Sequence, residues 1–337
     1  MKTKYILMVA WVALALTQVS CEKVSPQGVL MAGTAVEDRV KMSNQYYKDY
    51  LDEYNINLVL DEYTFLVGSD SHLTTDPGRM DEMFAIGLEG GDLLYTHLGD
   101  IADTKVEYYI TLDSLVKQAK HKFVDKLYGI NSKGCYYPIG DEEDAEDYEW
   151  TYDQIDFPFY PVVGNHDITH NGWALWSSIF HSSFYEFPVL VLTEEGDLVI
   201  DRFIFLDTAS GTLGRTQVDL IEDGVLDGSE GYTYRHTFVF GHTNIFRPSS
   251  LEFASTFSRE ETFFLLNQFE QWNASIVFCG HVHKWDERVY NNVTFLTLDS
   301  MSERNSPNPG DYLVRVHVKK DGTLQWERVH MNYVAKN

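Results

Sequence analysis

The sequence predicts a layered α/β domain, and two features of the chain support this. Short apolar runs rich in β-branched and aromatic residues alternate with longer amphipathic stretches, which is typical of strands that alternate with helices. The 337 residues, 44% of them hydrophobic, are enough for one large domain or two small ones. Ligands of a layered α/β fold gather at the carboxyl ends of its strands, so the residues that follow the strands are the first candidates for a site.

Five of the predicted strands end at a glycine, which stops a strand because it offers no side chain to pack. They are residues 63–67, 93–98, 159–163, 236–240 and 276–279. The last of these is apolar at every position, as expected of a strand buried on both faces. Further strands are predicted at 198–206, 293–298 and 312–318, and helices at 80–88, 106–127, 262–272 and within 35–57.

The first 21 residues have the features of an export signal. Two lysines precede an apolar run that is too short to span a membrane, and Cys21 follows the small residue Ser20. This cysteine resembles the lipidation site of a bacterial lipoprotein, although Gln18 departs from the aliphatic residue usual at its position. We favour a lipid anchor on Cys21 over ordinary signal-peptide cleavage. In both cases we expect an exported protein, periplasmic or at the cell surface, and the anchor would bind it to the membrane.

The chain is accordingly divided into three parts. Residues 1–21 are the signal segment, 22–61 are a tether with a helical lead-in, and 62–337 form one domain. The acidic run 140–147 lacks the spacing of an EF-hand loop, so a solvated loop is favoured over a calcium site. Cys135 and Cys279 either pair in an oxidising compartment or stay free, and the predicted burial of Cys279 favours free thiols.

The net charge of -25 limits the class of partner. Phosphate backbones require a basic surface, so no nucleic acid binding is expected. A small phosphate compound is not excluded, because bound divalent cations reverse the local charge. No feature of the sequence indicates an obligate protein partner.

Side chains suited to metal binding follow the same five strands. Imidazole nitrogen is the commonest protein ligand for zinc, iron and related ions, and carboxylate and amide oxygens complement it. One such loop alone would be equally consistent with surface residues, whereas five of them indicate a site. The residues are Asp70 and His72, Asp100 and Asp103, Asn165, His166 and Asp167, His242, and His281 and His283.

In this order the residues form the patterns D-x-H, G-D-x-x-D, G-N-H-[DE], G-H and G-H-x-H, and the sequence resembles the calcineurin-like metallophosphoesterase family. The resemblance extends from residue 70 to residue 283 and implies a four-layer αββα sandwich of two mixed β-sheets flanked by helices. It also implies a dinuclear metal centre. One ion would be held by Asp70, His72, Asp100 and His283, and the other by Asp100, Asn165, His242 and His281.

The resemblance also implies a role for each remaining residue. Asp100 would bridge the two ions, and mixed nitrogen and oxygen ligands favour Mn, Fe or Zn. His166 would lie beside the substrate phosphate as a general acid. Asp103 and Asp167 would orient neighbouring groups, and could equally cap the helices that follow their loops.

The predicted function is hydrolysis of a small phosphomonoester or phosphodiester by a water molecule that two metal ions activate. The tyrosine of purple acid phosphatases and the arginine signature of protein Ser/Thr phosphatases are missing from the motifs, which disfavours both subgroups. The alternative is a catalytically narrow or inactive metal-binding module of the same fold. Residues 173–176 could cover part of a substrate or could belong to the core, and His97 and Asp207 are predicted to be structural.

Overall fold

Two β-sheets lie face to face in the computed structural model, which describes residues 34–50, 59–224, 233–246, 257–302 and 311–332. The predicted signal segment, Cys21 and the tether up to residue 33 lie outside the described residues. None of the helices within the described ranges is long and apolar enough to cross a membrane.

The larger sheet has the strand order β1-β7-β8-β9-β10-β12-β11. Strands β8, β9, β10 and β12 run parallel, whereas β7 pairs antiparallel with β8 and parallel with β1, and β11 pairs antiparallel with β12. The sheet is therefore mixed. Its strands are β1 (Val59–Leu60), β7 (Tyr185–Leu192), β8 (Leu198–Phe205), β9 (Thr233–Phe240), β10 (Ala274–Cys279), β11 (Asp286–Tyr290) and β12 (Val293–Thr297).

The smaller sheet has the order β14-β13-β2-β3-β6. Strands β2, β3 and β6 run parallel, whereas β13 pairs antiparallel with both of its neighbours, so this sheet is mixed as well. Its strands are β2 (Tyr63–Gly68), β3 (Leu94–His97), β6 (Phe159–Pro161), β13 (Asp311–Val318) and β14 (Leu324–His330).

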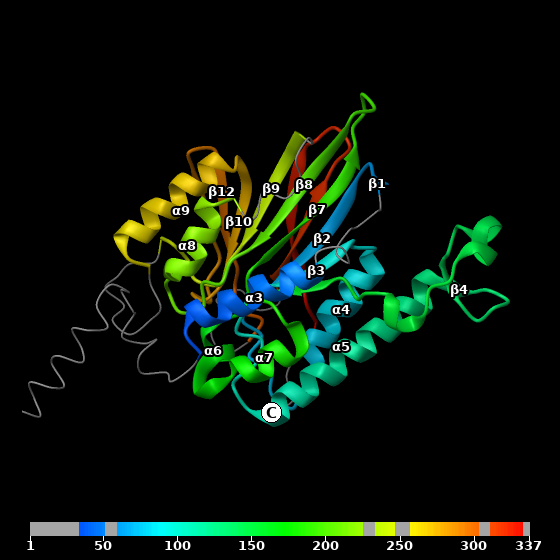
Figure 1. The fold of residues 1–337 in the computed structure, drawn as a ribbon, viewed down its shortest axis with the longest axis horizontal. Helices are drawn as coiled ribbons and strands as arrows, with labels where there is room; N and C mark the ends of the chain where they lie inside the picture. Colours follow the sequence, from blue (N-terminus) through cyan, green and yellow to red (C-terminus); the bar gives the residue numbers. More distant parts are fainter. Residues whose placement is uncertain (1–33, 51–58, 225–232, 247–256, 303–310, 333–337) are drawn as a thin grey trace, which may run out of the picture.

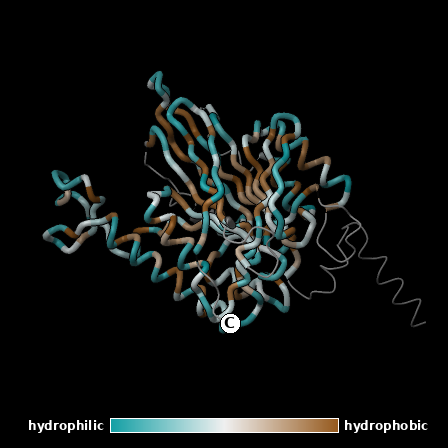
Figure 2. The backbone as a smooth tube through the Cα atoms, turned by 180° about the vertical axis from the view of Figure 1, so that it is seen from behind, coloured by the Kyte–Doolittle hydropathy of each residue, from teal (hydrophilic) through white to brown (hydrophobic). Residues whose placement is uncertain are grey.

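Successive side chains of a strand point to opposite faces of its sheet, and here the side chains on both faces of each sheet are packed into the core. In β2, Phe65 and Val67 point into the layer between the sheets, and Leu66 points to the opposite side, where helices cover the sheet. Phenylalanines from β8, β9 and β10 fill the inner layer from the larger sheet. Burying such a side chain stabilises a fold by roughly 1.5–3 kcal/mol. Figure 2 shows hydrophobic residues concentrated along these strands.

Helices cover the outer face of each sheet (Figure 1). Helices α4 (Gly78–Gly90), α5 (Val106–Leu127) and α7 (Trp173–Phe180) contribute to the cluster on the smaller sheet. Helices α3 (Val36–Tyr50), α8 (Gly214–Glu222) and α9 (Arg259–Gln271) contribute to the cluster on the larger sheet. The predicted four-layer sandwich of two mixed sheets flanked by helices is confirmed.

An arm projects from the carboxyl end of α5 (Figure 1). It consists of the hairpin β4 (Tyr128–Ile130) and β5 (Tyr136–Pro138), followed by the 3-10 turns η2 (Glu142–Asp147) and η3 (Tyr152–Gln154). None of the acidic residues of η2 is buried, as expected of a solvated loop. Cys135 in this arm and Cys279 in β10 are both free.

Candidate metal centre

The five loops with the predicted ligands meet at one end of the sandwich. Three of them follow the parallel strands β2, β3 and β6 of the smaller sheet, and two follow β9 and β10 of the larger one. Carboxyl ends of parallel strands share one edge of a sheet. The two edges are joined because His242 Nδ1 donates to the carbonyl oxygen of Leu98 at 2.7 Å and the amide of His281 donates to Asp70 Oδ2 at 3.0 Å.

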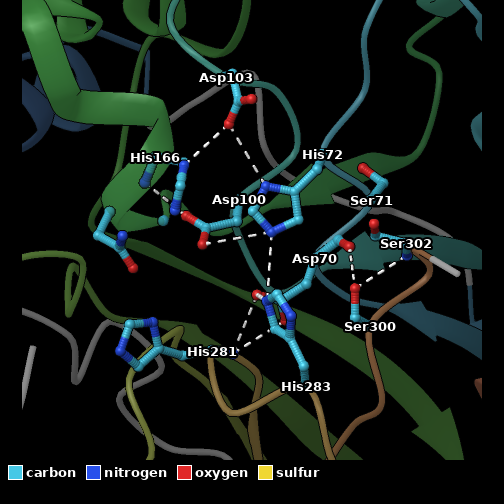
Figure 3. A network of polar contacts seen from close by, with 12 residues as sticks. Asp70, Ser71, His72, Asp100, Asp103, His166, His281, His283, Ser300 and Ser302 are labelled. Atoms are coloured by element: carbon cyan, nitrogen blue, oxygen red, sulfur yellow. Dashed lines mark hydrogen bonds and ion pairs between the residues drawn. The ribbon is translucent and has the colours of Figure 1, made fainter. Parts of the chain in front are cut away.

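The first group of side chains that could hold a metal ion is Asp70, His72, Asp100 and His283. His283 Nε2 lies 3.1 Å from Asp70 Oδ1 and 3.3 Å from His72 Nε2 (Figure 3). His72 Nε2 lies 4.0 Å from Asp100 Oδ2. Two imidazole nitrogens and two carboxylate oxygens that converge in this way form a mixed donor set of the kind that binds Zn, Mn or Fe.

The second group is Asp100, His242 and His281. His242 Nε2 lies 3.4 Å from Asp100 Oδ2 and 3.1 Å from His281 Nδ1. The amide oxygen of Asn165 lies 3.0 Å from the same imidazole nitrogen, and therefore completes a set of four donors. Because the Nδ1 proton of His242 is donated to a carbonyl, its Nε2 is the nitrogen presented to this group.

Asp100 belongs to both groups. Its Oδ2 faces His72 on one side and His242 on the other, and the side chain is almost completely buried. A carboxylate can face two cations at once, so this position suits a bridging ligand. The seven residues assigned from the resemblance therefore lie in two sets of donors that share Asp100.

Five of these residues have a left-handed backbone. Their φ angles lie between 43° and 67°, and they are Asp70, His72, Asp100, His281 and His283. Only a few per cent of residues other than glycine adopt such angles, and they are concentrated at functional sites, where the surrounding structure supports the strain. These strained loops turn the ligand side chains inward after β2, β3 and β10.

Glycine allows the loops to approach one another closely. A Cβ atom at Gly164 would lie 2.0 Å from the Asp100 backbone nitrogen, and one at Gly280 would lie 2.1 Å from Ser69 Oγ and 2.6 Å from Asp70 Oδ2. Neither position has room for a side chain. Gly164 and Gly280, two of the glycines that end predicted strands, are therefore required by the packing of the site itself.

The electrostatics of the site favour bound cations. Burial would raise the pKa of Asp70, but the hydrogen bond from His283 and the charge of His242 lower this pKa to about 2. Burial likewise would lower the pKa of His242, but the charge of Asp100 raises it to about 9. The carboxylates that favour a proton on the imidazole also favour a metal ion in place of that proton, so ion binding should release protons.

Asp103 connects two histidines at the more exposed side of the site (Figure 3). Its Oδ1 accepts a hydrogen bond from His166 Nδ1 at 2.9 Å and lies 3.5 Å from His72 Nδ1. The hydrogen bond to Asp103 raises the pKa of His166 to about 9. His166 is half-exposed, and its backbone amide donates to Asp100 Oδ1 at 2.7 Å, which holds it beside the bridging carboxylate.

Asp167 is buried behind the second group. Its carboxylate accepts hydrogen bonds from the amides of Gly164 at 2.8 Å and Ala102 at 3.1 Å. Burial and the nearby charge of Asp100 raise its pKa to about 7. Asp167 therefore both caps the short helix α6 (Asn165–Ile168) and ties the loop after β3 to the loop after β6.

Other predicted residues lie outside the donor groups. Trp173 and Trp176 are buried in the core cluster on the smaller sheet, which excludes a role in covering substrate. His97 is fully buried, as expected of a core histidine, but neither ring nitrogen has a hydrogen-bond partner among the described residues. Burial lowers the pKa of His97 to about 3.

The sequence did not reveal the serines that hold Asp70. Ser69 Oγ donates to the Asp70 carboxylate, and Ser300 Oγ donates to the Asp70 carbonyl at 2.8 Å. The amide of Ser302 donates to the same carbonyl at 3.2 Å and to Ser300 Oγ at 2.9 Å (Figure 3). Serine is common on every surface, so only the positions of these residues could have indicated their role. Ser69 directly follows β2, and Ser300 lies three residues after the end of β12.

No protein-family model matches this sequence, and neither does any curated protein. Similar solved structures include a dimetal phosphatase from Danio rerio, with 12% identity, a TM-score of 0.48 and coverage of 80% of this chain and 96% of that one. They also include GAP50, the anchor in the inner membrane complex of Plasmodium, with 13% identity, a TM-score of 0.43 and coverage of 81% and 90%.

A third similar structure is a 5'-nucleotidase described as putative, from Staphylococcus aureus, with 10% identity, a TM-score of 0.41 and coverage of 80% of this chain and 53% of that one. At this similarity the chemistry of the site depends on the residues of this chain.

Proposed function

We propose that this chain is a metallophosphoesterase that hydrolyses a small phosphomonoester or phosphodiester at a dinuclear metal centre. The observation that carries the proposal is the position of Asp100 Oδ2, 3.4 Å from His242 Nε2 and 4.0 Å from His72 Nε2, between two sets of metal donors. One ion would be held by Asp70, His72, Asp100 and His283. The other would be held by Asp100, Asn165, His242 and His281.

Bound at these positions, two ions would supply Lewis acidity that activates water and neutralises charge on the phosphoryl oxygens. The residues of the chain supply the rest of the chemistry. Asp103 accepts a hydrogen bond from Nδ1 of His166, so Nε2 is the atom that can donate a proton to a leaving oxygen. The raised pKa of His166 keeps that proton in place at neutral pH. Asp167 fixes the loops on which Asp100 and Asn165 lie.

Metal content and hydrolysis test this proposal together. The purified protein would be assayed on bis-p-nitrophenyl phosphate and p-nitrophenyl phosphate with added Mn²⁺, alongside Asp100→Asn, His166→Ala and the control His121→Ala. His121 lies exposed on α5, so its removal should change nothing. We expect about two ions per chain and loss of both hydrolysis and metal in Asp100→Asn. His166→Ala should keep its metal and lose less activity on these two compounds, because the p-nitrophenolate leaving group needs no proton. Bound metal without turnover of either compound would favour the inactive binding module, and absence of metal would reject the proposal.

We also propose that the protein is exported and anchored to a membrane through Cys21. The lysines, the short apolar run and the small residue before Cys21 support this. Labelling of living cells with a fatty-acid analogue should mark the wild type but not Cys21→Ser, and the variant should leave the membrane fraction. A label on both proteins, or on neither, would contradict the anchor.

The substrate is proposed to be a small phosphoester rather than a nucleic acid. The net charge of -25 slows the approach of long polyanions, and this repulsion is strongest at low salt. Rates on small diesters should therefore exceed rates on DNA or RNA at low ionic strength. The opposite order would contradict this part of the proposal.

A further inference from the structure

Arg39 of the N-terminal helix α3 forms a buried ion pair with Asp207, a residue 168 positions later in the chain. Its Nε and Nη2 donate to the two carboxylate oxygens of Asp207, each at 2.8 Å, and both side chains are fully buried. A bidentate pair of this kind fixes geometry as well as charge. Asp207 follows β8 by two residues and lies at the same end of the larger sheet as the metal donors.

The Asp207 carboxylate and backbone are held by further buried groups. Ser183 Oγ donates to Asp207 Oδ2 at 2.7 Å, and the Gln217 side chain bonds to both the amide and the carbonyl of Asp207 at 2.9 Å. Gln217 belongs to α8, which packs against α3. The position of residue 207 is therefore set by α3, α8 and the loop before β7.

Thr208 transmits this position to the second group of donors. Thr208 Oγ1 accepts hydrogen bonds from the amides of His242 at 2.7 Å and Thr243 at 3.0 Å, and the Thr208 carbonyl accepts one from Thr243 Oγ1 at 2.6 Å. These contacts hold the backbone of the loop that carries His242. The other group, of Asp70, His72 and His283, has no hydrogen bond to Thr208 within the described residues.

We propose that Arg39 is a positioning residue for the second metal ion, acting through Asp207 and Thr208 on His242, so that the N-terminal helix determines how tightly this one ion is held. The inference rests on the proposed function, because it presumes that His242 is a ligand. The proposed effect is on the affinity for one ion of the pair and not for the other, and this difference distinguishes a positioning role from a purely structural one. An ion pair that stabilised only the fold would affect both ions alike or neither.

A second buried arginine, in the strand β8 that precedes Asp207, provides a matched control. Arg202 Nε donates to Glu186 Oε2 at 2.6 Å, and both side chains are almost fully buried. Arg202 precedes Asp207 by five residues, about 16 Å along an extended strand, and so lies in the middle of β8, away from the loop of His242. Arg202→Met removes a buried arginine of the same kind without touching the loop of His242.

The test is calorimetric titration of the metal-stripped, full-length protein with Mn²⁺, for the wild type and for Arg39→Met, Thr208→Val and Arg202→Met. Replacing groups that orient a ligand typically weakens metal binding about 10-fold to 100-fold. We expect Arg39→Met and Thr208→Val each to weaken one ion about tenfold and to leave the affinity for the other unchanged. Arg202→Met should leave both affinities unchanged. His242→Ala identifies the affected ion, because it should abolish binding of that same ion.

Equal weakening of both ions in Arg39→Met, no weakening of either, or the same result in Arg202→Met would overturn the inference. If Arg39→Met does not fold, Arg39→Lys replaces it. Lysine keeps the charge but cannot bond to both carboxylate oxygens, so it should weaken the same ion. Two bound ions in the wild type without hydrolysis would reject the proposed function and still leave the inference decided by binding alone.

Discussion

A methyl group at Gly164 should damage the site more than any surface change. The φ of this residue is -106°, which alanine adopts without strain, so Gly164→Ala tests space alone. The added Cβ would lie 2.0 Å from the backbone nitrogen of Asp100 and 2.3 Å from its Oδ1. Both atoms belong to the residue that is proposed to bridge the two ions, and the first cannot rotate away.

The magnitude follows from these distances. Ordinary contact begins near 3.4 Å, so the Asp100 backbone and residue 164 must separate by about 1.4 Å. A misplacement of about 1 Å can reduce catalysis about 100-fold. We therefore expect kcat/KM for a p-nitrophenyl phosphoester to fall at least about 100-fold, with overpacking lowering the unfolding free energy by about 1–3 kcal/mol.

The control is Gly91→Ala. Gly91 has a φ of 70° and no atom within 4 Å of an added Cβ, so this change imposes backbone strain of about 1 kcal/mol far from any steric clash. It should lower the melting temperature and leave kcat/KM unchanged. Wild-type kcat/KM in folded, metal-loaded Gly164→Ala would refute the claim that close approach of these loops positions Asp100.

Three further predictions concern single residues. His166→Ala should lower kcat about 10²-fold to 10⁴-fold on alkyl phosphoesters and much less on p-nitrophenyl esters, whose leaving group needs no proton; an equal loss on both, measured at saturating metal, would contradict the general acid. Because burial lowers the pKa of His97 to about 3, the unfolded chain takes up a proton below pH 6.5 that the folded chain does not, and the wild type should lose about 2 kcal/mol of stability through His97 between pH 7 and pH 5. Urea unfolding of His97→Leu should show a correspondingly smaller loss of unfolding free energy between pH 7 and pH 5. An identical loss in the wild type and the variant would contradict this role of His97. Burial raises the pKa of Cys279 to about 12, so iodoacetamide at pH 8 should modify Cys135 and spare Cys279 in the native protein, which mass spectrometry can check.

The strands that position the site could be predicted because their patterns are local. Apolar runs that end at glycine gave β2, β3, β9 and β10 to within two residues, apart from the polar start of β9. Strand β7 was missed because it contains Pro188, which lacks the amide proton that a ladder needs. The structure accommodates this proline because β1 pairs with β7 only at residues 190 and 191, beyond Pro188.

The convergence of the donors could also be predicted, because the order of the motifs and the rule about strand ends concern short segments. The contacts that hold the donors in place could not. Asp207 follows a predicted strand and is predicted to be structural, but Arg39 lies 168 residues away and nothing in the sequence links the two, so their pairing emerges only when α3 packs on the larger sheet. Ser300 supports Asp70 from 230 residues away for the same reason.

The measurement that tests the central claim most directly is electron paramagnetic resonance of the protein loaded with Mn²⁺. If Asp100 bridges two ions, the wild type should give a spin-coupled signal from a manganese pair, with about two ions per chain by metal analysis. Asp100→Asn should lose the coupling. Signals of isolated Mn²⁺ alone in the fully loaded wild type, or binding of a single ion, would contradict the dinuclear centre.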